Sequence, residues 1–125
     1  MKDCYTTKRL LLRPASISMA AALADYYRRN EAFLRPFEPQ REPAFYTEAF
    51  QRSILEQEEI NASQAQAFRF YLSMREEPEK IIGKIGLNNI VWGCFESCFL
   101  GYSLDAEYLR RGLMTEAVTE CVRIA

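Results

Sequence analysis

The sequence has 125 residues, of which 49% are hydrophobic and 26% are charged, and its formal net charge is −1. This composition is typical of an ordinary globular protein, and we expect one domain over residues 1–125. The charge balance excludes a general binder of nucleic acid or membrane surfaces, which needs a basic excess. The sequence contains no apolar run of membrane-spanning length and no signal-peptide core at its start, so we expect a cytoplasmic protein.

The residue types present limit the possible chemistry. There is no histidine, which excludes Ser-His-Asp and Cys-His hydrolases. Of the four cysteines, Cys94 and Cys98 are close in sequence, but histidine ligands and a second cysteine pair are missing. We therefore expect no metal site, and reduced cysteines that pack as small hydrophobic side chains.

The first part of the chain predicts a strand, a helix and a loop. Residues 8–13 form a short strand that ends at Pro14, and Ser16 is a candidate N-cap for the next helix. We expect this helix to end near Asn30. Its apolar face comprises Ala20, Leu23, Ala24 and Tyr27. Residues 33–39 combine prolines with aromatic residues and predict an unusually apolar loop.

A second helix is predicted over residues 44–59, with Tyr46, Phe50 and Ile54 on one face. The hydrophobic period then changes to two, which predicts a half-buried strand over residues 67–74. Residues 96–104 predict a later strand. The interval from 67 to 104 therefore predicts an antiparallel meander of three strands.

The middle strand of this meander is predicted over residues 80–91. Ile81, Ile85 and Leu87 are expected on one side of it. Gly83 and Gly86 weaken the strand pattern and indicate a bulge or a close backbone approach.

Residues 104–117 form the most informative segment, because an apolar strand runs through a short turn into an amphipathic helix. The first amides of a helix lack partners and attract phosphate oxygens. Gly112 permits a close backbone approach, and Arg110 and Arg111 add positive charge. The pattern predicts an anion site, although a plain connection with solvated arginines remains an equal alternative from this pattern alone. The helical pattern still runs at Ala125, from which we expect a C-terminally incomplete domain.

The order of elements and five segments resemble the GNAT acetyltransferases, within them the branch of ribosomal-protein-alanine N-acetyltransferases. Residues 7–13 look like the family's first strand, and residues 30–39 look like its substrate-side loop. Residues 82–89 and 100–104 look like its third and fourth strands, and residues 110–117 look like its cofactor loop. The resemblance implies an α+β fold of order β-α-α-β-β-β-α, with a mostly antiparallel sheet flanked by helices.

The resemblance also implies acetyl-coenzyme A as the co-substrate. The pantetheine arm would pair with the backbone of Tyr102, Ser103 and Leu104. The pyrophosphate would bind the amides of the loop and first helical turn, that is, Arg110, Arg111, Gly112, Leu113, Met114 and Thr115. The family pattern has Gln or Arg where this chain has Leu109, and Gly or Ala where it has Met114.

The implied reaction is direct attack of a primary amine on the thioester, with the carbonyl polarised by a backbone N–H near Leu104. The acceptor would be a protein N-terminal amine, or alternatively a small amine. No catalytic base is assigned; Glu96 is a weak candidate, with a solvated charge as the alternative. Candidate acceptor contacts are Phe33, Phe37, Glu38 and Asn88. The alternatives are core packing for the two aromatic residues, solvation for Glu38 and a strand end for Asn88. A non-catalytic coenzyme A-binding or oligomerising remnant is the second hypothesis.

Overall fold

We describe the protein from a computed structural model, over residues 4–34, 36, 42–63, 67–88 and 99–124. The strands are β1 (Tyr5–Thr6), β2 (Leu10–Pro14), β3 (Ala67–Met74), β4 (Gly83–Asn88) and β5 (Phe99–Leu104). The α-helices are α1 (Ala20–Leu34), α2 (Glu48–Ser63) and α3 (Leu113–Ile124). Short 3-10 helices occupy η1 (Ile17–Met19), η2 (Pro43–Tyr46) and η4 (Ala106–Tyr108).

The strands form one five-stranded sheet in the order β1-β2-β3-β4-β5, and each neighbouring pair is antiparallel. The predicted meander of β3, β4 and β5 is therefore confirmed. The predicted order lacked β1, whose two residues carry no periodic signal, and β2 begins at Leu10 because residues 8 and 9 lie in the turn between the two strands. Close approach at the β4 glycines is also confirmed, since a Cβ on Gly83 would lie 2.8 Å from the Ser103 carbonyl oxygen.

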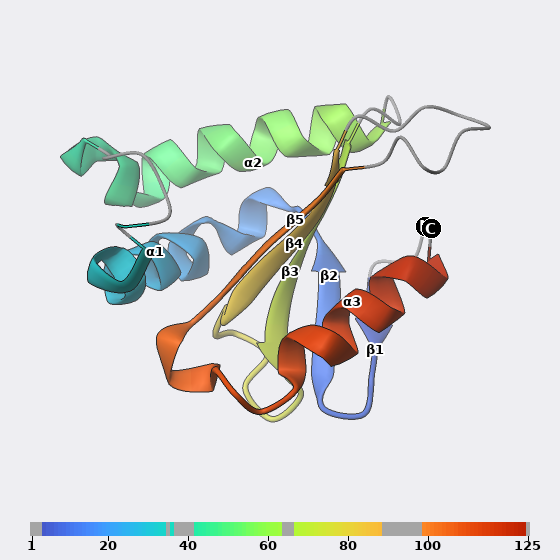
Figure 1. Cartoon of the computed structure of the whole chain (residues 1–125). Coiled ribbons are helices and arrows are strands. Elements are labelled where there is room, and N and C mark those ends of the chain that lie inside the picture. The colour runs from blue at the N-terminus through green and yellow to red at the C-terminus, as the bar shows by residue number, and fades with distance from the viewer. Residues whose placement is uncertain (1–3, 35, 37–41, 64–66, 89–98, 125) are drawn as a thin grey trace.

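The molecule has three layers, with α1 and α2 on one face of the sheet and α3 on the other (Figure 1). Each helical layer has its own apolar cluster against the sheet. Tyr71 of β3 joins the cluster of α1 and α2, whereas its neighbour Leu72 joins the cluster of α3. The half-buried strand predicted here is therefore wrong, because helices cover both faces of β3.

The helix α1 continues to Leu34, so the predicted end near Asn30 is wrong, as is the loop at Phe33. Asn30 is 1% exposed; its side-chain amide donates to the Tyr26 carbonyl at 3.0 Å and accepts from the Ala106 N–H at 2.9 Å. Asn30 thus does not end the helix; its buried side chain joins α1 to the backbone of η4. Before the helix, Ser16 is an N-cap as predicted, and its hydroxyl accepts from the Ser18 N–H of η1.

Two other predicted faces are shifted. Thr47 is extended and separates η2 from α2, so Tyr46 lies outside the helix and Phe50 is 40% exposed. The buried positions of α2 are instead Gln51 and Leu55. Before β4, Ile81 precedes the strand ladder and packs in the α1/α2 cluster, whereas Ile85 packs in the α3 cluster, so the two do not share a side.

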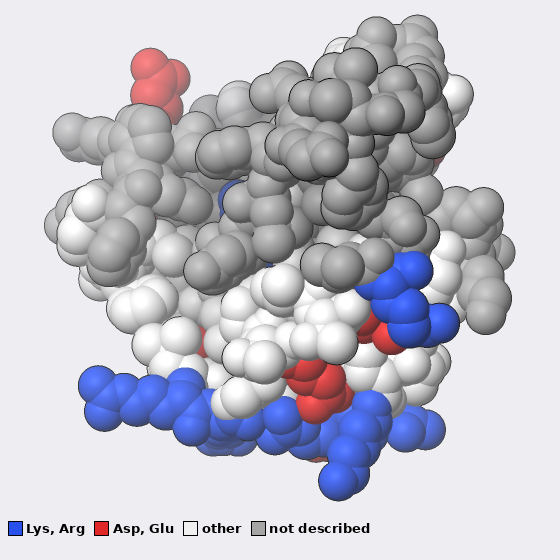
Figure 2. All heavy atoms as spheres, turned by 45° about the vertical axis from the view of Figure 1, so that its right-hand side comes forward, with Lys and Arg blue, Asp and Glu red and all other residues white. Residues whose placement is uncertain are grey.

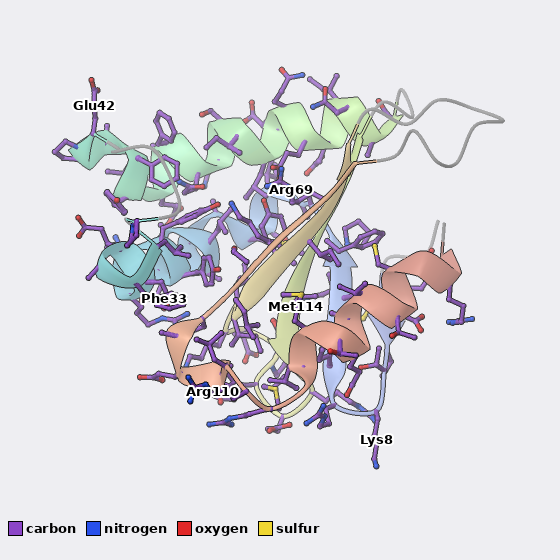
Figure 3. The ribbon with its side chains drawn as sticks, in the orientation of Figure 1. Lys8, Phe33, Glu42, Arg69, Arg110 and Met114 are labelled. Atoms are coloured by element: carbon purple, nitrogen blue, oxygen red, sulfur yellow. The ribbon has the colours of Figure 1, made fainter. Side chains whose placement is uncertain are left out.

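Among the described residues, no helix combines the length and the apolar character that crossing a bilayer requires. The same residues contain no group of three metal-ligating side chains, while Cys94 and Cys98 lie outside them. Lysine and arginine side chains form a row along the lower edge of the face shown in Figure 2. Lys8 and Arg110 are labelled at the corresponding lower end of the molecule in Figure 3, where the β1–β2 turn and the connection before α3 meet.

Candidate functional site

The connection from β5 to α3 has the strand, turn and helix start that the sequence predicts. Leu104 ends β5, and Asp105 then caps η4 by accepting a hydrogen bond from the Glu107 N–H at 2.9 Å. Arg110 has a φ of 62° and Gly112 a φ of 72°, and α3 begins at the next residue. Gly112 is suited to this left-handed conformation because it has no Cβ, whereas Arg110 adopts it at an energetic cost.

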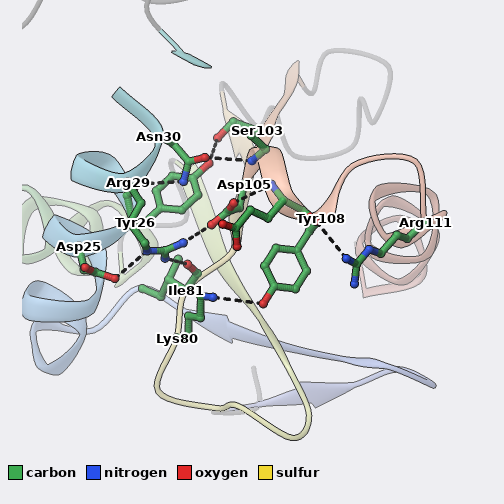
Figure 4. Close-up of polar contacts among 12 residues, drawn as sticks. Asp25, Tyr26, Arg29, Asn30, Lys80, Ile81, Ser103, Asp105, Tyr108 and Arg111 are labelled. Carbon is green, nitrogen blue, oxygen red and sulfur yellow. Dashed lines mark hydrogen bonds and ion pairs between the residues drawn. The ribbon is translucent and has the colours of Figure 1, made fainter. Parts of the chain in front are cut away.

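The start of this connection is anchored to α1 (Figure 4). Arg29 forms an ion pair with Asp105, and its guanidinium also donates to the Ile81 carbonyl at 2.8 Å. Burial alone lowers the pKa of Arg29, but the hydrogen bonds and charges of Asp25 and Asp105 outweigh it and raise the pKa. The Asp105 N–H donates to the Ile82 carbonyl, so backbone and side chain both fix the end of β5.

The buried Tyr108 ring packs under the connection and contacts two cationic side chains. It is 9% exposed, and the Lys80 ammonium and the Arg111 guanidinium each lie 5.2 Å from its ring centroid. Lys80 also donates to the Tyr108 hydroxyl at 3.3 Å, and this hydrogen bond raises the pKa of Lys80. Arg111 donates to the Glu107 carbonyl at 3.1 Å. Arg111 is thus oriented by cation–π and hydrogen-bond contacts.

The end of the connection is fixed from the opposite direction by the β1–β2 turn. Arg9 donates to the Arg111 carbonyl at 2.8 Å and forms an ion pair with Glu116 of α3 at 2.8 Å. The Glu116 carboxylate also accepts from the Arg9 N–H and from the Thr7 hydroxyl. Burial alone raises the pKa of Glu116, but these hydrogen bonds outweigh it and lower the pKa.

The three β5 residues predicted to face pantetheine lie at the edge of the described sheet. Tyr102, Ser103 and Leu104 pair with Ile85, Lys84 and Gly83 of β4. Within the described residues, no strand pairs with the other edge of β5. The Ser103 hydroxyl is in contact with the buried Tyr26 hydroxyl at 2.8 Å, so its side chain faces α1.

The residues predicted to present amides lie in the first turn of α3. Leu113 is buried, Met114 packs against the α3 cluster, and Thr115 is exposed. The first hydrogen bond of this helix runs from the Glu116 N–H to the Gly112 carbonyl at 3.1 Å. Helix geometry therefore leaves the preceding amides available for an anion, and Met114 does not block them because its side chain turns toward the core (Figure 3).

The predicted acceptor residues are not gathered in one place by the described structure. Phe33 lies on α1, where it packs against the α1/α2 cluster on the opposite side of the sheet from Met114 (Figure 3). Asn88 is the last residue of β4, in agreement with the strand-end alternative, and its side chain is not described. Phe37, Glu38 and Glu96 lie outside the described residues.

Sequence reasoning missed the residues that support the connection. Arg9, Arg29 and Asn30 all come from elements far from it in the sequence, and only the fold brings them together. A charged residue near the start of a strand and a buried asparagine carry no distinctive local pattern, so no sequence signal identified them.

The comparisons with known proteins agree with this geometry. The acetyltransferase (GNAT) domain family matches residues 9–125. The chain is 38% identical over 120 residues to the [ribosomal protein uS5]-alanine N-acetyltransferase of Escherichia coli, covering 94% of this chain and 60% of that protein. The chain thus spans about three fifths of the length of the curated relative it matches.

Solved structures show the same fold. A ribosomal-protein-S5-alanine acetyltransferase from Vibrio fischeri superposes with a TM-score of 0.88 at 32% identity, covering 98% of this chain and 66% of that one. The ribosomal L7/L12 α-N-protein acetyltransferase RimL in complex with coenzyme A superposes with a TM-score of 0.78 at 19% identity, covering 95% and 64%. The α+β fold with an antiparallel sheet between helices is therefore that of these enzymes, and the chain belongs to the GNAT acetyltransferase domain family.

Proposed function

We propose that the protein is an acetyl-CoA-dependent N-acetyltransferase that acts on a primary amine, specifically the N-terminal alanine of a protein. The observation that carries the proposal is the fixed connection of residues 105–112, which leads from the end of β5 through a left-handed glycine to the first amides of α3. The identity of 38% to a ribosomal-protein-alanine N-acetyltransferase supports the choice of acceptor. The coenzyme A complex of a protein with the same fold supports the choice of donor.

In this proposal, the pantetheine arm pairs with the backbone of Tyr102, Ser103 and Leu104. The diphosphate binds the amides of residues 110–115, with Arg110 and Arg111 as counter-charges. The residues present suit an anion in charge, because Arg110 and Arg111 lie in the loop and the Arg9 Nη2 lies 3.6 Å from the position that a Cβ on Gly112 would occupy. Arg110 is exposed, whereas the cation–π contact with Tyr108 fixes Arg111.

Bound acetyl-CoA supplies an activated thioester carbonyl. The acceptor amine loses a proton and its nitrogen forms a bond to the carbonyl carbon; the carbon–sulfur bond then breaks and coenzyme A leaves as the thiol after taking up a proton. A backbone N–H near Leu104 would stabilise the negative oxygen. Glu96 is the candidate base, and Phe33, Phe37, Glu38 and Asn88 are the candidate acceptor contacts.

The test is acetyl transfer to a synthetic peptide that begins with alanine, followed by mass spectrometry. We expect the peptide to gain one acetyl group at its N-terminus in the presence of acetyl-CoA, and the same peptide with a blocked N-terminus to gain none. Acetyl-CoA binding without transfer to any amine would contradict the enzymatic proposal and favour a coenzyme A-binding remnant. A Glu96→Gln variant with unchanged transfer rates at all pH values would remove Glu96 as the base.

A further inference from the structure

The backbone between η4 and α3 includes a left-handed residue that is not glycine, Arg110, whose residue type disfavours this conformation. Arg110 and Gly112 are the positive-φ residues that the structure records among its described residues, and they flank Arg111. A left-handed conformation is disfavoured for arginine, so surrounding contacts must stabilise it. These contacts are found at the carbonyl between the two left-handed residues.

Arg9 binds this carbonyl from a different element. The Arg9 Nη1 donates to the Arg111 carbonyl oxygen at 2.8 Å, across 102 positions of sequence. The Arg9 Nη2 lies 3.6 Å from the position that a Cβ on Gly112 would occupy. One guanidinium therefore contacts the carbonyl at the centre of the loop and lies beside the glycine that ends it.

Glu116 orients this guanidinium. One carboxylate oxygen accepts from the Arg9 Nε at 2.8 Å, and the other accepts from the Arg9 backbone N–H at 2.9 Å and from the Thr7 hydroxyl. The Glu116 side chain is 18% exposed, and its own N–H makes the first hydrogen bond of α3 with the Gly112 carbonyl. The helix start, the loop and the β1–β2 turn are thus joined through Glu116 and Arg9.

We propose that Arg9 and Glu116 are positioning residues that hold residues 110–112 in the conformation that presents the loop amides to the diphosphate of acetyl-CoA. This inference rests on the proposed function and extends it to two residues outside the predicted loop contacts. Because the amides are fixed before the ligand arrives, binding does not have to order the loop. Arg9 and Glu116 therefore affect binding of the diphosphate end of the donor and do not affect binding of its acetylated end.

The test compares two acetyl donors, acetyl-CoA and S-acetylpantetheine, which lacks both the diphosphate and the nucleotide. We expect Arg9→Gln and Glu116→Gln each to weaken acetyl-CoA binding about tenfold, comparable to losing one charge-assisted hydrogen bond, while S-acetylpantetheine binding stays unchanged. The double variant is expected to lose no more than about the larger single effect, because the two residues act as one unit. Competition titration gives both affinities.

Arg28→Gln is the matched control, since Arg28 is an exposed arginine of α1 that donates to the Tyr46 carbonyl at 3.1 Å. This variant removes the same charge without contacting Arg9 or Glu116, and we expect less than about a twofold change in acetyl-CoA affinity. If Arg9→Gln does not fold by circular dichroism, Arg9→Lys carries the test, because an ammonium keeps the charge but lacks the planar fork. Arg9→Lys should also weaken the binding of acetyl-CoA but not the binding of S-acetylpantetheine.

Equal weakening of the binding of both donors, or unchanged binding of acetyl-CoA, would overturn the positioning role. A wild-type protein that fails to bind acetyl-CoA would instead contradict the proposed function itself, so the two failures are distinguishable.

Discussion

Arg29 of α1 forms an ion pair with Asp105, the residue that directly follows β5, and the Asp105 side chain is only 3% exposed. The pair joins the helical layer of α1 to the end of the strand that leads into the candidate site (Figure 4). Its geometry is supported by further hydrogen bonds from Arg29 to the Ile81 carbonyl and from the Glu107 N–H to Asp105. The pair therefore fixes where the connection begins, as Arg9 and Glu116 fix where it ends.

We expect Asp105→Asn to destabilise the protein strongly, because it leaves the Arg29 charge without its buried partner. The expected loss is about 3 kcal/mol, at the lower end for such a change because Arg29 keeps contact with solvent. Urea unfolding followed by circular dichroism measures it. Asp25→Asn is the control: Asp25 also pairs with Arg29, but its side chain is 54% exposed, so we expect a loss below about 0.5 kcal/mol. Equal losses would contradict this account.

The two glycines of β4 allow a matched test of strand packing. A Cβ on Gly83 would lie 2.8 Å from the Ser103 carbonyl oxygen, which belongs to the backbone of β5 and cannot move freely. A Cβ on Gly86 would lie 2.9 Å from the Arg69 Nε, part of a flexible side chain. We expect Gly83→Ala to cost about 1–3 kcal/mol of unfolding free energy, and Gly86→Ala to cost clearly less. The reverse order would show that the β4–β5 contact is not tight.

Gly112 tests the left-handed turn before α3. With its φ of 72°, an alanine at this position is strained even though the nearest side-chain atom lies 3.6 Å away. We expect Gly112→Ala to lower the free energy of unfolding by about 1–2 kcal/mol. Gly112→Asn should lower it less, because asparagine tolerates this conformation better. Thermal and urea unfolding of both variants measure the difference, and identical stabilities of the two would argue against a left-handed residue here.

The lowered pKa of Glu116 predicts a pH dependence of stability. A carboxyl whose pKa is lower in the folded state stabilises the fold above its unfolded pKa, near the ordinary value of 4.5, and this stability is lost as the pH falls through the folded pKa. We expect Glu116→Gln to destabilise the protein at neutral pH, and the gap in unfolding free energy to the wild type to shrink as the pH falls below the ordinary value of 4.5. Unfolding measured over this pH range tests it, and a gap independent of pH would contradict it.

Much of the sheet and of the site connection could be predicted from the sequence, because local patterns determine them. The period-two strands and the Gly112 turn before an amphipathic helix both correspond to observed elements. The burial of both faces of the sheet could not be predicted in the same way. Alternation in β3 indicates one covered face, whereas Tyr71 is buried in the cluster of α1 and α2 and Leu72 in the cluster of α3. The contacts of Arg9, Arg29 and Asn30 depend on the tertiary arrangement and leave no local signal.

In the proposed function, this chain binds acetyl-CoA through the connection between β5 and α3. Isothermal titration of the purified protein with acetyl-CoA measures this binding, with Gly112→Ala and Arg111→Gln as variants of the connection. We expect one acetyl-CoA bound per chain, with weaker binding in both variants. Absence of binding by the folded wild-type chain, or binding that neither variant changes, would contradict it.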